Sequence, residues 1–149
     1  MPAKPVISGP MSLALEEARQ AAARGEVPVG AALVQEGVVL ARAGNRMRET
    51  GDPTAHAEML AIRAAARVER LTGTDMYVTL EPCTMCAAAI SFARIRRLYF
   101  GAYDPKAGAV ESGVRFFDQA TCHHSPEVYG GIAEGEAAAL LVAFFKSRR

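Results

Sequence analysis

The feature that most constrains the fold of this chain is a pair of short segments that carry metal-binding side chains. Residues 56–58 read His-Ala-Glu, and residues 82–86 read Pro-Cys-Thr-Met-Cys. Cys83 and Cys86 are three residues apart, a separation of about 60° around a helix, so both sulfur atoms can face one point. Binding of a single ion by both segments requires them to lie together in the folded chain.

These side chains suit one zinc ion. We expect each segment in the first turn of a helix, where free backbone N–H groups and the helix dipole favour thiolates over thiols. His56, Cys83 and Cys86 offer an imidazole and two thiolates, and three protein ligands leave the fourth tetrahedral position open. An open position is typical of catalytic rather than structural zinc. Soft sulfur ligands favour zinc over other divalent ions.

Glu58 adds a proton carrier to this metal site. A carboxylate beside zinc-bound water can take its proton and deliver it to a leaving nitrogen. His56 and Glu58 are two residues apart, about 200° on a regular helix, so they cannot share one helix face. They converge only if the turn wraps around the site, with the metal close to the start of the helix.

Each half of the pattern also has an ordinary structural explanation. Cys83 and Cys86 alone would fit a redox pair, or two small buried side chains in an alanine-rich helix. A lone His56 is more often a hydrogen-bonded histidine than a ligand. Both segments together, each at an expected helix start after a β-prone run, favour the metal site.

Length, charge and cysteine usage place broad limits on the chain. Its 149 residues fit one domain, with the proline-rich residues 1–10 as a loose N-terminal arm. The formal net charge of +1 neither indicates nor excludes a nucleic-acid partner. We find no signal peptide, and the apolar run over 137–145 is about half of a membrane span. Three cysteines that cannot all pair suit a reducing compartment, so we expect a cytoplasmic protein.

Hydrophobic patterns predict a hairpin followed by alternating strands and helices, which implies a layered α/β sheet. The expected helices cover residues 11–25, the Asp52-Pro53-Thr54 start to about 67, 81 to about 94, and 134–146. The expected strands cover residues 29–34, 38–43, 76–80, 97–102 and 127–129, with a tight turn at 35–37 and a loop at 103–113.

Further motifs extend well beyond the metal segments. They read EVPVGA at 26–31, DPTAHAE at 52–58, YVTLEPC at 77–83, FGA at 100–102, DPKAGA at 104–109 and FFK at 144–146. From about residue 11 to the end, the chain resembles the bacterial tRNA-specific adenosine deaminases of the cytidine-deaminase superfamily. The two metal segments are already the known signature of zinc nucleobase deaminases.

The resemblance implies a cytidine-deaminase-like three-layer α/β sandwich, with a five-stranded mixed sheet and helices on both faces. It implies a single zinc-dependent deaminase domain over residues 1–149, one Zn²⁺ per subunit and a homodimer. The implied reaction is hydrolytic deamination of adenosine to inosine at the wobble position of a tRNA anticodon, with the anticodon stem-loop as partner. Zinc-bound hydroxide would attack C6, and Glu58 would protonate N1 and then the departing ammonia.

The resemblance also assigns roles to single residues. His56, Cys83 and Cys86 would hold zinc. Asn45 would hydrogen-bond the flipped nucleoside, backbone groups of Ala57 would read the base edge, and residues 27–29, including Val29, would wall the pocket. Asp104 and Lys106 would touch flanking nucleotides, with Phe144 or Phe145 as a stacking or packing group. Phosphate contacts would come from Arg94, Arg96, Arg97, Lys106, Lys146, Arg148 and Arg149.

Residue patterns alone leave several of these roles open. Asn45 and Asp104 equally suit turns, the basic residues equally suit a solvated surface, and one of Phe144 and Phe145 suits the core. The segment 111–129 departs from the family: many members carry Asn-His-Arg where residues 123–125 read His-His-Ser, which weakens the case for the same RNA contacts. A second metal site at Cys122, His123 and His124 is the less common reading of such a loop.

Two other functions are compatible with the same residues. One is a small-molecule deaminase that acts on guanine, cytosine or cytidine with the same zinc site. The other is a zinc-stabilised RNA-binding subunit without turnover, against which the presence of Glu58 argues. Asp104, Lys106 and the basic C-terminal end favour the tRNA enzyme, because a free-base enzyme has no need of them.

Overall fold

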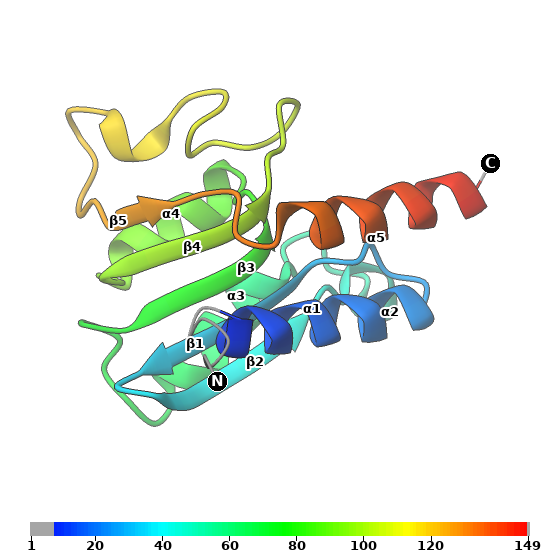
Figure 1. The fold of residues 1–149 in the computed structure, drawn as a ribbon. Helices are drawn as coiled ribbons and strands as arrows, with labels where there is room; N and C mark the ends of the chain where they lie inside the picture. The colour runs from blue at the N-terminus through cyan, green and yellow to red at the C-terminus, as the bar shows by residue number, and fades with distance from the viewer. Residues whose placement is uncertain (1–7, 149) are drawn as a thin grey trace, which may run out of the picture.

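The computed structural model describes residues 8–148, which form a five-stranded mixed sheet in the order β2-β1-β3-β4-β5 (Figure 1). The strands are β1 (Gly30–Gln35), β2 (Val38–Gly44), β3 (Asp75–Leu80), β4 (Arg97–Ala102) and β5 (Glu127–Tyr129). β1 pairs antiparallel with β2 and β3, whereas β3, β4 and β5 are parallel. The predicted fold class is confirmed, and all five strands lie within one residue of their predicted positions.

Helices cover both faces of the sheet (Figure 1). They are α1 (Ser8–Ala23), α2 (Met47–Thr50), α3 (Ala57–Ala66), α4 (Thr84–Phe92) and α5 (Glu134–Ser147), with a short 3-10 helix η1 (Phe116–Asp118). α1 and α5 contact each other on one face, and α3 and α4 contact each other on the opposite face. No helix within residues 8–148 is both long and apolar enough to cross a membrane.

The contact between α1 and β1 depends on small side chains. Ala14 and Ala18 of α1 are fully buried. A Cβ atom built on Gly30 would overlap the carbonyl oxygen of Ala14 and lie 2.6 Å from the backbone nitrogen of Ala18. The helix therefore lies directly on the strand at Gly30, which only glycine permits.

The hairpin and its turn form as predicted. Glu36 and Gly37 have φ values of 48° and 80°, as expected for a two-residue turn whose twist matches the strands. The first turn of α1 takes up residues 8–10 of the predicted loose arm. The rest of that arm, residues 1–7, lies outside the described residues.

The predicted helix starts need correction. The helix predicted from Asp52-Pro53-Thr54 begins at Ala57 instead, because Asp52 Oδ1 accepts bonds from the N–H and hydroxyl of Thr54 and closes a separate turn. The helix predicted from residue 81 begins at Thr84. The four-residue helix α2 was not predicted, since one helical turn has no apolar period to detect.

Candidate metal and catalytic site

The two predicted metal segments meet at the first residues of α3 and α4. His56 and Cys83 are the residues immediately before these helices, and both have extended backbone, with ψ of 151° and 177°. Glu58 and Cys86 lie inside the first turns. His56 and Glu58 can therefore lie on the same side of the site although they are two residues apart, because His56 lies outside the helix and its backbone is extended.

The three ligand atoms have the spacing of a tetrahedral zinc site. Nδ1 of His56 lies 3.6 Å from Sγ of Cys83 and 3.5 Å from Sγ of Cys86. Tetrahedral zinc with ordinary Zn–S and Zn–N bonds sets such N···S separations at about 3.6 Å. Within residues 8–148 this is the one cluster of three or more His, Cys, Asp or Glu side chains positioned to hold a metal. The residues fit the ion that the sequence predicts.

Hydrogen bonding within the cluster has opposite effects on the two sulfur atoms. A hydrogen bond from the Cys86 side chain lowers the pKa of Cys83 to about 4. A second bond with His56 acts in the same direction, and burial acts against both. The hydrogen bond between the two cysteines raises the pKa of Cys86, and burial raises it further. A hydrogen bond between His56 and Cys83 raises the pKa of His56. Cys83 is thus the thiol that loses its proton more readily, and a metal cation that displaces the Cys86 proton completes the ligand set.

Glu58 is buried beside this cluster, with 4% of its surface exposed. Burial raises the pKa of Glu58 to about 7. A carboxyl group with a pKa near neutrality takes up and releases protons at comparable cost, which suits general acid–base chemistry. Glu58 also lines the same cavity as His56 and Cys83.

That cavity has a volume of about 160 Å³ and opens toward a larger one of about 500 Å³. Residues that line the small cavity are Val27, Val29, Asn45, Met47, His56, Glu58, Leu80, Glu81, Cys83, Asp104 and Ala107. Val27, Leu80, Asp104 and Ala107 line both cavities. The small cavity is below the about 300–1,000 Å³ of typical ligand pockets, so it suits one compact group while the rest of a ligand lies outside.

Asn45 connects the second strand to the catalytic helix. Its Oδ1 accepts the Ala57 N–H at 2.8 Å, a donor left free at the start of α3. This bond leaves the Asn45 amide nitrogen as the side chain's donor for a ligand. The Ala57 N–H is already engaged, and Ala57 is not among the residues that line the cavity, so its predicted contact with a base edge stays a prediction. Val29 lines the cavity beside Asn45.

Glu81 holds the loop that borders both cavities, a role that the sequence did not predict. Its carboxylate accepts N–H bonds from Asp104, Val110, Glu111 and Ser112 at 2.8–3.1 Å, and a hydroxyl bond from Ser112. Burial disfavours the charge, but these donors outweigh it and lower the pKa of Glu81. No local motif signals this role, because the donors lie 23 to 31 residues away.

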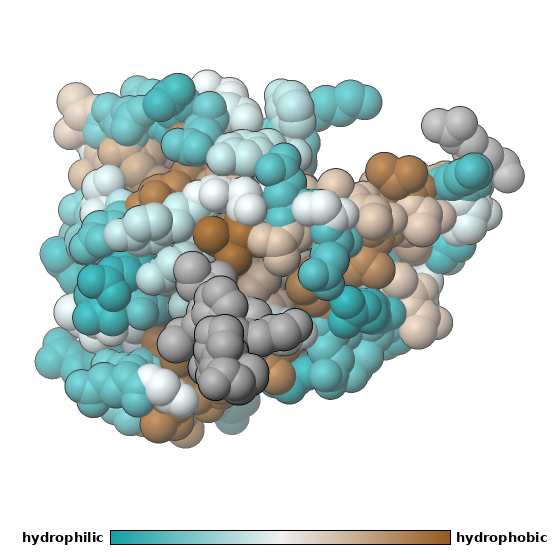
Figure 2. All heavy atoms as spheres, in the orientation of Figure 1, coloured by the Kyte–Doolittle hydropathy of each residue, from teal (hydrophilic) through white to brown (hydrophobic). Residues whose placement is uncertain are grey.

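Asp104, Lys106 and Phe145 surround the larger cavity. Asp104 Oδ1 accepts the N–H groups of Lys106 and Ala107, so this side chain also forms a turn. Hydrophobic side chains gather over α5 (Figure 2), and Phe145 on this helix is 51% exposed. The structure therefore brings these three residues together around the larger cavity, and only Asp104 of the three also lines the small cavity with Glu58.

The cysteine and histidines of the divergent segment lie elsewhere. Cys122 Sγ lies 3.6 Å from the Ser91 hydroxyl and donates to the carbonyl oxygen of His124. Nε2 of His124 lies 3.0 Å from the Ile95 carbonyl oxygen. These contacts tie the segment to the end of α4. Within the described part of the chain, these residues belong to no metal-ligand cluster.

Comparisons with known proteins agree with this geometry. Residues 7–102 match the zinc-binding region of cytidine and deoxycytidylate deaminases. A tRNA-specific adenosine deaminase of Agrobacterium fabrum is 66% identical over 142 residues, which cover 93% of each chain. A solved structure from work on A-to-I editing by tRNA:A34 deaminases at the wobble position has a TM-score of 0.88 and 66% identity, and the match covers 90% of this chain and 99% of the other. A guanine deaminase from Bacillus subtilis has a TM-score of 0.61 and 35% identity over 63% of this chain and 62% of its own.

Proposed function

Because this chain belongs to the zinc-binding cytidine and deoxycytidylate deaminase family, and within it to the tRNA-specific adenosine deaminases, we propose that it hydrolyses adenosine to inosine at the wobble position of a tRNA anticodon. The observation that carries the proposal is the cavity in which His56 and Cys83 lie beside buried Glu58, with Cys86 completing the ligand set. The reaction consumes one water and releases one ammonia.

Each residue of the small cavity then has a chemical task. His56, Cys83 and Cys86 would hold the zinc ion, which supplies Lewis acidity and makes water acidic near neutral pH. Glu58 would accept a proton at its carboxylate and donate it to N1 of the adenine, then carry a second proton to the leaving amino group. Asn45 would donate its amide N–H to the nucleoside, and Val29 would exclude water from one side.

The sizes of the two cavities support a nucleic-acid substrate. A base that enters the 160 Å³ cavity leaves its sugar and neighbours in the 500 Å³ cavity, where Asp104, Lys106 and Phe145 are available. A target base must leave its stack to reach a site this enclosed, and unpairing costs least in a single-stranded loop.

The test is a parallel assay of RNA and free compounds. The zinc-loaded protein would be incubated with a tRNA whose anticodon begins with adenosine, and inosine would be read by sequencing. Free adenosine, cytidine and guanine would be assayed for ammonia under the same conditions. We expect inosine at the wobble position and no ammonia from the free compounds. Turnover of guanine with unchanged tRNA would replace this proposal by a small-molecule deaminase.

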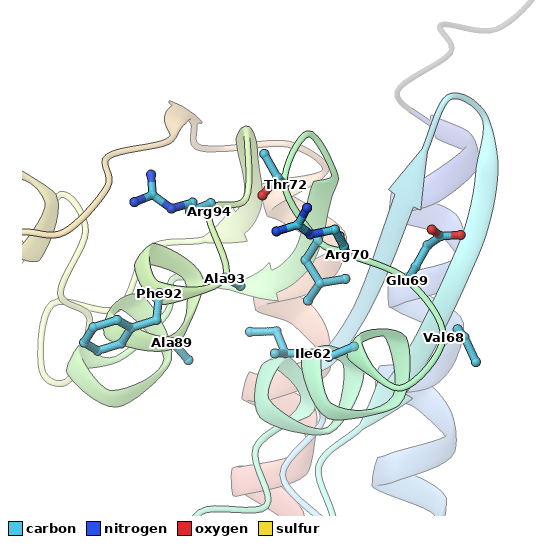
Figure 3. A pocket seen from close by; sticks show the side chains of 11 residues that line it. Ile62, Val68, Glu69, Arg70, Thr72, Ala89, Phe92, Ala93 and Arg94 are labelled. Atoms are coloured by element: carbon cyan, nitrogen blue, oxygen red, sulfur yellow. The ribbon is translucent and has the colours of Figure 1, made fainter.

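We also propose a homodimer through the exposed ends of α3 and α4. A groove of about 930 Å³ lies there, with Phe92 and Val68 on opposite sides and Arg70 and Arg94 above Ile62 (Figure 3). Phe92 and Val68 are 71% and 75% exposed, which is unusual for large apolar side chains. A two-fold interface would cover this groove with its own copy.

Light scattering after gel filtration tests the dimer. Phe92→Asp is expected to give a monomer, whereas Val142→Asp, at a 66% exposed valine on α5, is expected to stay dimeric. A dimeric Phe92→Asp protein would exclude this interface. Because the proposed substrate is tRNA, we further propose a cytoplasmic location.

A further inference from the structure

Two arginine side chains lie close to Gly25, near the candidate active site. A Cβ atom built on Gly25 would lie 3.4 Å from Nη1 of Arg48 and 3.6 Å from Nη2 of Arg148. Arg48 belongs to α2 and Arg148 follows α5, so segments a hundred residues apart in sequence supply the pair. The two guanidinium groups therefore flank one point that a side chain at residue 25 would fill.

Neither guanidinium group is neutralised by a carboxylate. In the part of the chain that the structure describes, Arg48 and Arg148 have no Asp or Glu oxygen within 4.0 Å. Nη1 of Arg48 donates to the Gly25 carbonyl oxygen at 3.2 Å, and Arg148 lies 4.2 Å from the centre of the Phe144 ring. These contacts orient both groups and leave their charges available.

The acidic side chains nearby are engaged elsewhere. Oε1 of Glu49 lies 2.6 Å from Nη1 of Arg46 and 3.8 Å from Nε of Arg24. The Glu26 carboxylate is buried and accepts the backbone N–H groups of residues 48 and 49. Four arginines, at positions 24, 46, 48 and 148, therefore outnumber the two glutamates of this region, and neither glutamate has a carboxylate oxygen within 4.0 Å of the guanidinium groups of the pair.

A cavity of about 250 Å³ is lined by both arginines and shares two lining residues with the active-site cavity. It is lined by Gly25, Glu26, Val27, Met47, Arg48, Phe144, Phe145 and Arg148. Val27 and Met47 also line the 160 Å³ cavity that holds Glu58, and Phe145 also lines the 500 Å³ cavity. Arg48 is therefore the neighbour in sequence of Met47, a residue that lines the active-site cavity.

We infer that Arg48 and Arg148 together clamp one backbone phosphate of the RNA, next to the nucleotide whose base enters the active-site cavity. The inference rests on the proposed function for its substrate class. Phosphate oxygens accept charge-assisted bonds of about 2.8 Å from guanidinium groups, so one phosphate can bridge two arginines that flank a single point. The contact carries no sequence information and positions the strand.

The experiment measures binding of an anticodon stem-loop RNA to the zinc-loaded protein as a function of KCl concentration, with inosine counted in the same samples. The variant Arg48→Gln/Arg148→Gln is compared with wild type and with Arg19→Gln/Arg67→Gln, which removes the same charge from exposed positions elsewhere. We expect Kd to rise about tenfold in the first variant, and the salt slope to fall by about 0.7 for one lost phosphate contact. The control variant should keep both values.

A second arm identifies the phosphate. RNAs with an uncharged methylphosphonate at single positions around the target adenosine should bind wild type more weakly at one position only, and the double variant should be indifferent to that position. Equal Kd and salt slope in both double variants would overturn the clamp, even with normal inosine formation. Arginine-dependent binding without inosine would retain the clamp and reject the proposed deamination.

Discussion

At the scale of single residues, two buried carboxyl groups near the same cavity have opposite properties. Burial raises the pKa of Glu58 to about 7 in spite of bonds from its own backbone N–H and from Cys86, whereas Glu81 accepts five bonds that lower its pKa against the effect of burial. The first group can exchange protons near neutral pH, and the second is a fixed charge that holds a loop. Both residues are glutamates, so the difference between their roles comes from their surroundings in the fold.

Glu58→Ala is expected to abolish deamination while zinc content and Tm stay at wild-type values. Loss of a general acid–base group costs about 100- to 10,000-fold in rate, and no ligand of the metal is removed. Single-turnover inosine formation and atomic absorption measure the two effects. Activity within tenfold of wild type, at full zinc content, would contradict the role of Glu58.

Glu81→Gln is expected to lose stability in a pH-dependent manner. Because the pKa of Glu81 is lower in the folded state, its contribution is present above the unfolded pKa and is lost as pH falls through the folded value. Wild type should exceed the variant by about 2 kcal/mol at pH 7, and the difference should shrink below about pH 4. Urea unfolding at several pH values measures it, with exposed Glu36→Gln as the control that should show no such difference.

At the scale of elements, local sequence predicted strands and helices well and helix starts poorly. Strands such as β4 stand out because apolar side chains dominate them, and Gly37 marks the hairpin turn. The start of α3 was misplaced because Asp52-Pro53 carries a local start signal, while the N–H of Ala57 is satisfied by Asn45 from twelve residues upstream. Such a long-range partner leaves no trace in the neighbouring sequence.

The close contact of α1 with β1 predicts a sharp cost for one added methyl group. Gly30→Ala should destabilise the protein by about 1–3 kcal/mol, because the new Cβ would meet the backbone of Ala14 and Ala18. Gly135→Ala, in α5 with open space around it, should be neutral or stabilising. Thermal unfolding of the two variants makes the comparison, and equal Tm values would show that α1 can move away from the strand.

At the scale of the whole molecule, the sequence predicted the metal ligands, the sheet and part of the cavity wall, including Val29 and Asn45, but not the rest of the wall. His56, Cys83 and Cys86 were evident because their types and spacing satisfy one ion. Met47 and Glu81 were not, since no local motif marks Met47 and the donors to Glu81 lie 23 to 31 residues away. The metal ligands could therefore be predicted from short sequence motifs, whereas the shape of the cavities could be determined only from the three-dimensional structure.

Removal of the metal is expected to lower the Tm of the whole domain. An ion present at about a thousand times its Kd stabilises the folded state by about 4 kcal/mol, which for a chain of this size is about 10 °C in Tm. Calorimetry before and after a chelator, with zinc added back as the control, measures the change. An unchanged Tm would mean that the ligands are held equally well without the ion.

Because His56 and Cys83 lie immediately before α3 and α4, the stabilisation by zinc has a consequence beyond catalysis. An ion held there fastens two helix starts that are 27 residues apart in the chain. Chains made under zinc starvation would open more often and be degraded faster, since proteases act on the opened population. Zinc supply would therefore set how many molecules a cell retains, as well as how active each one is.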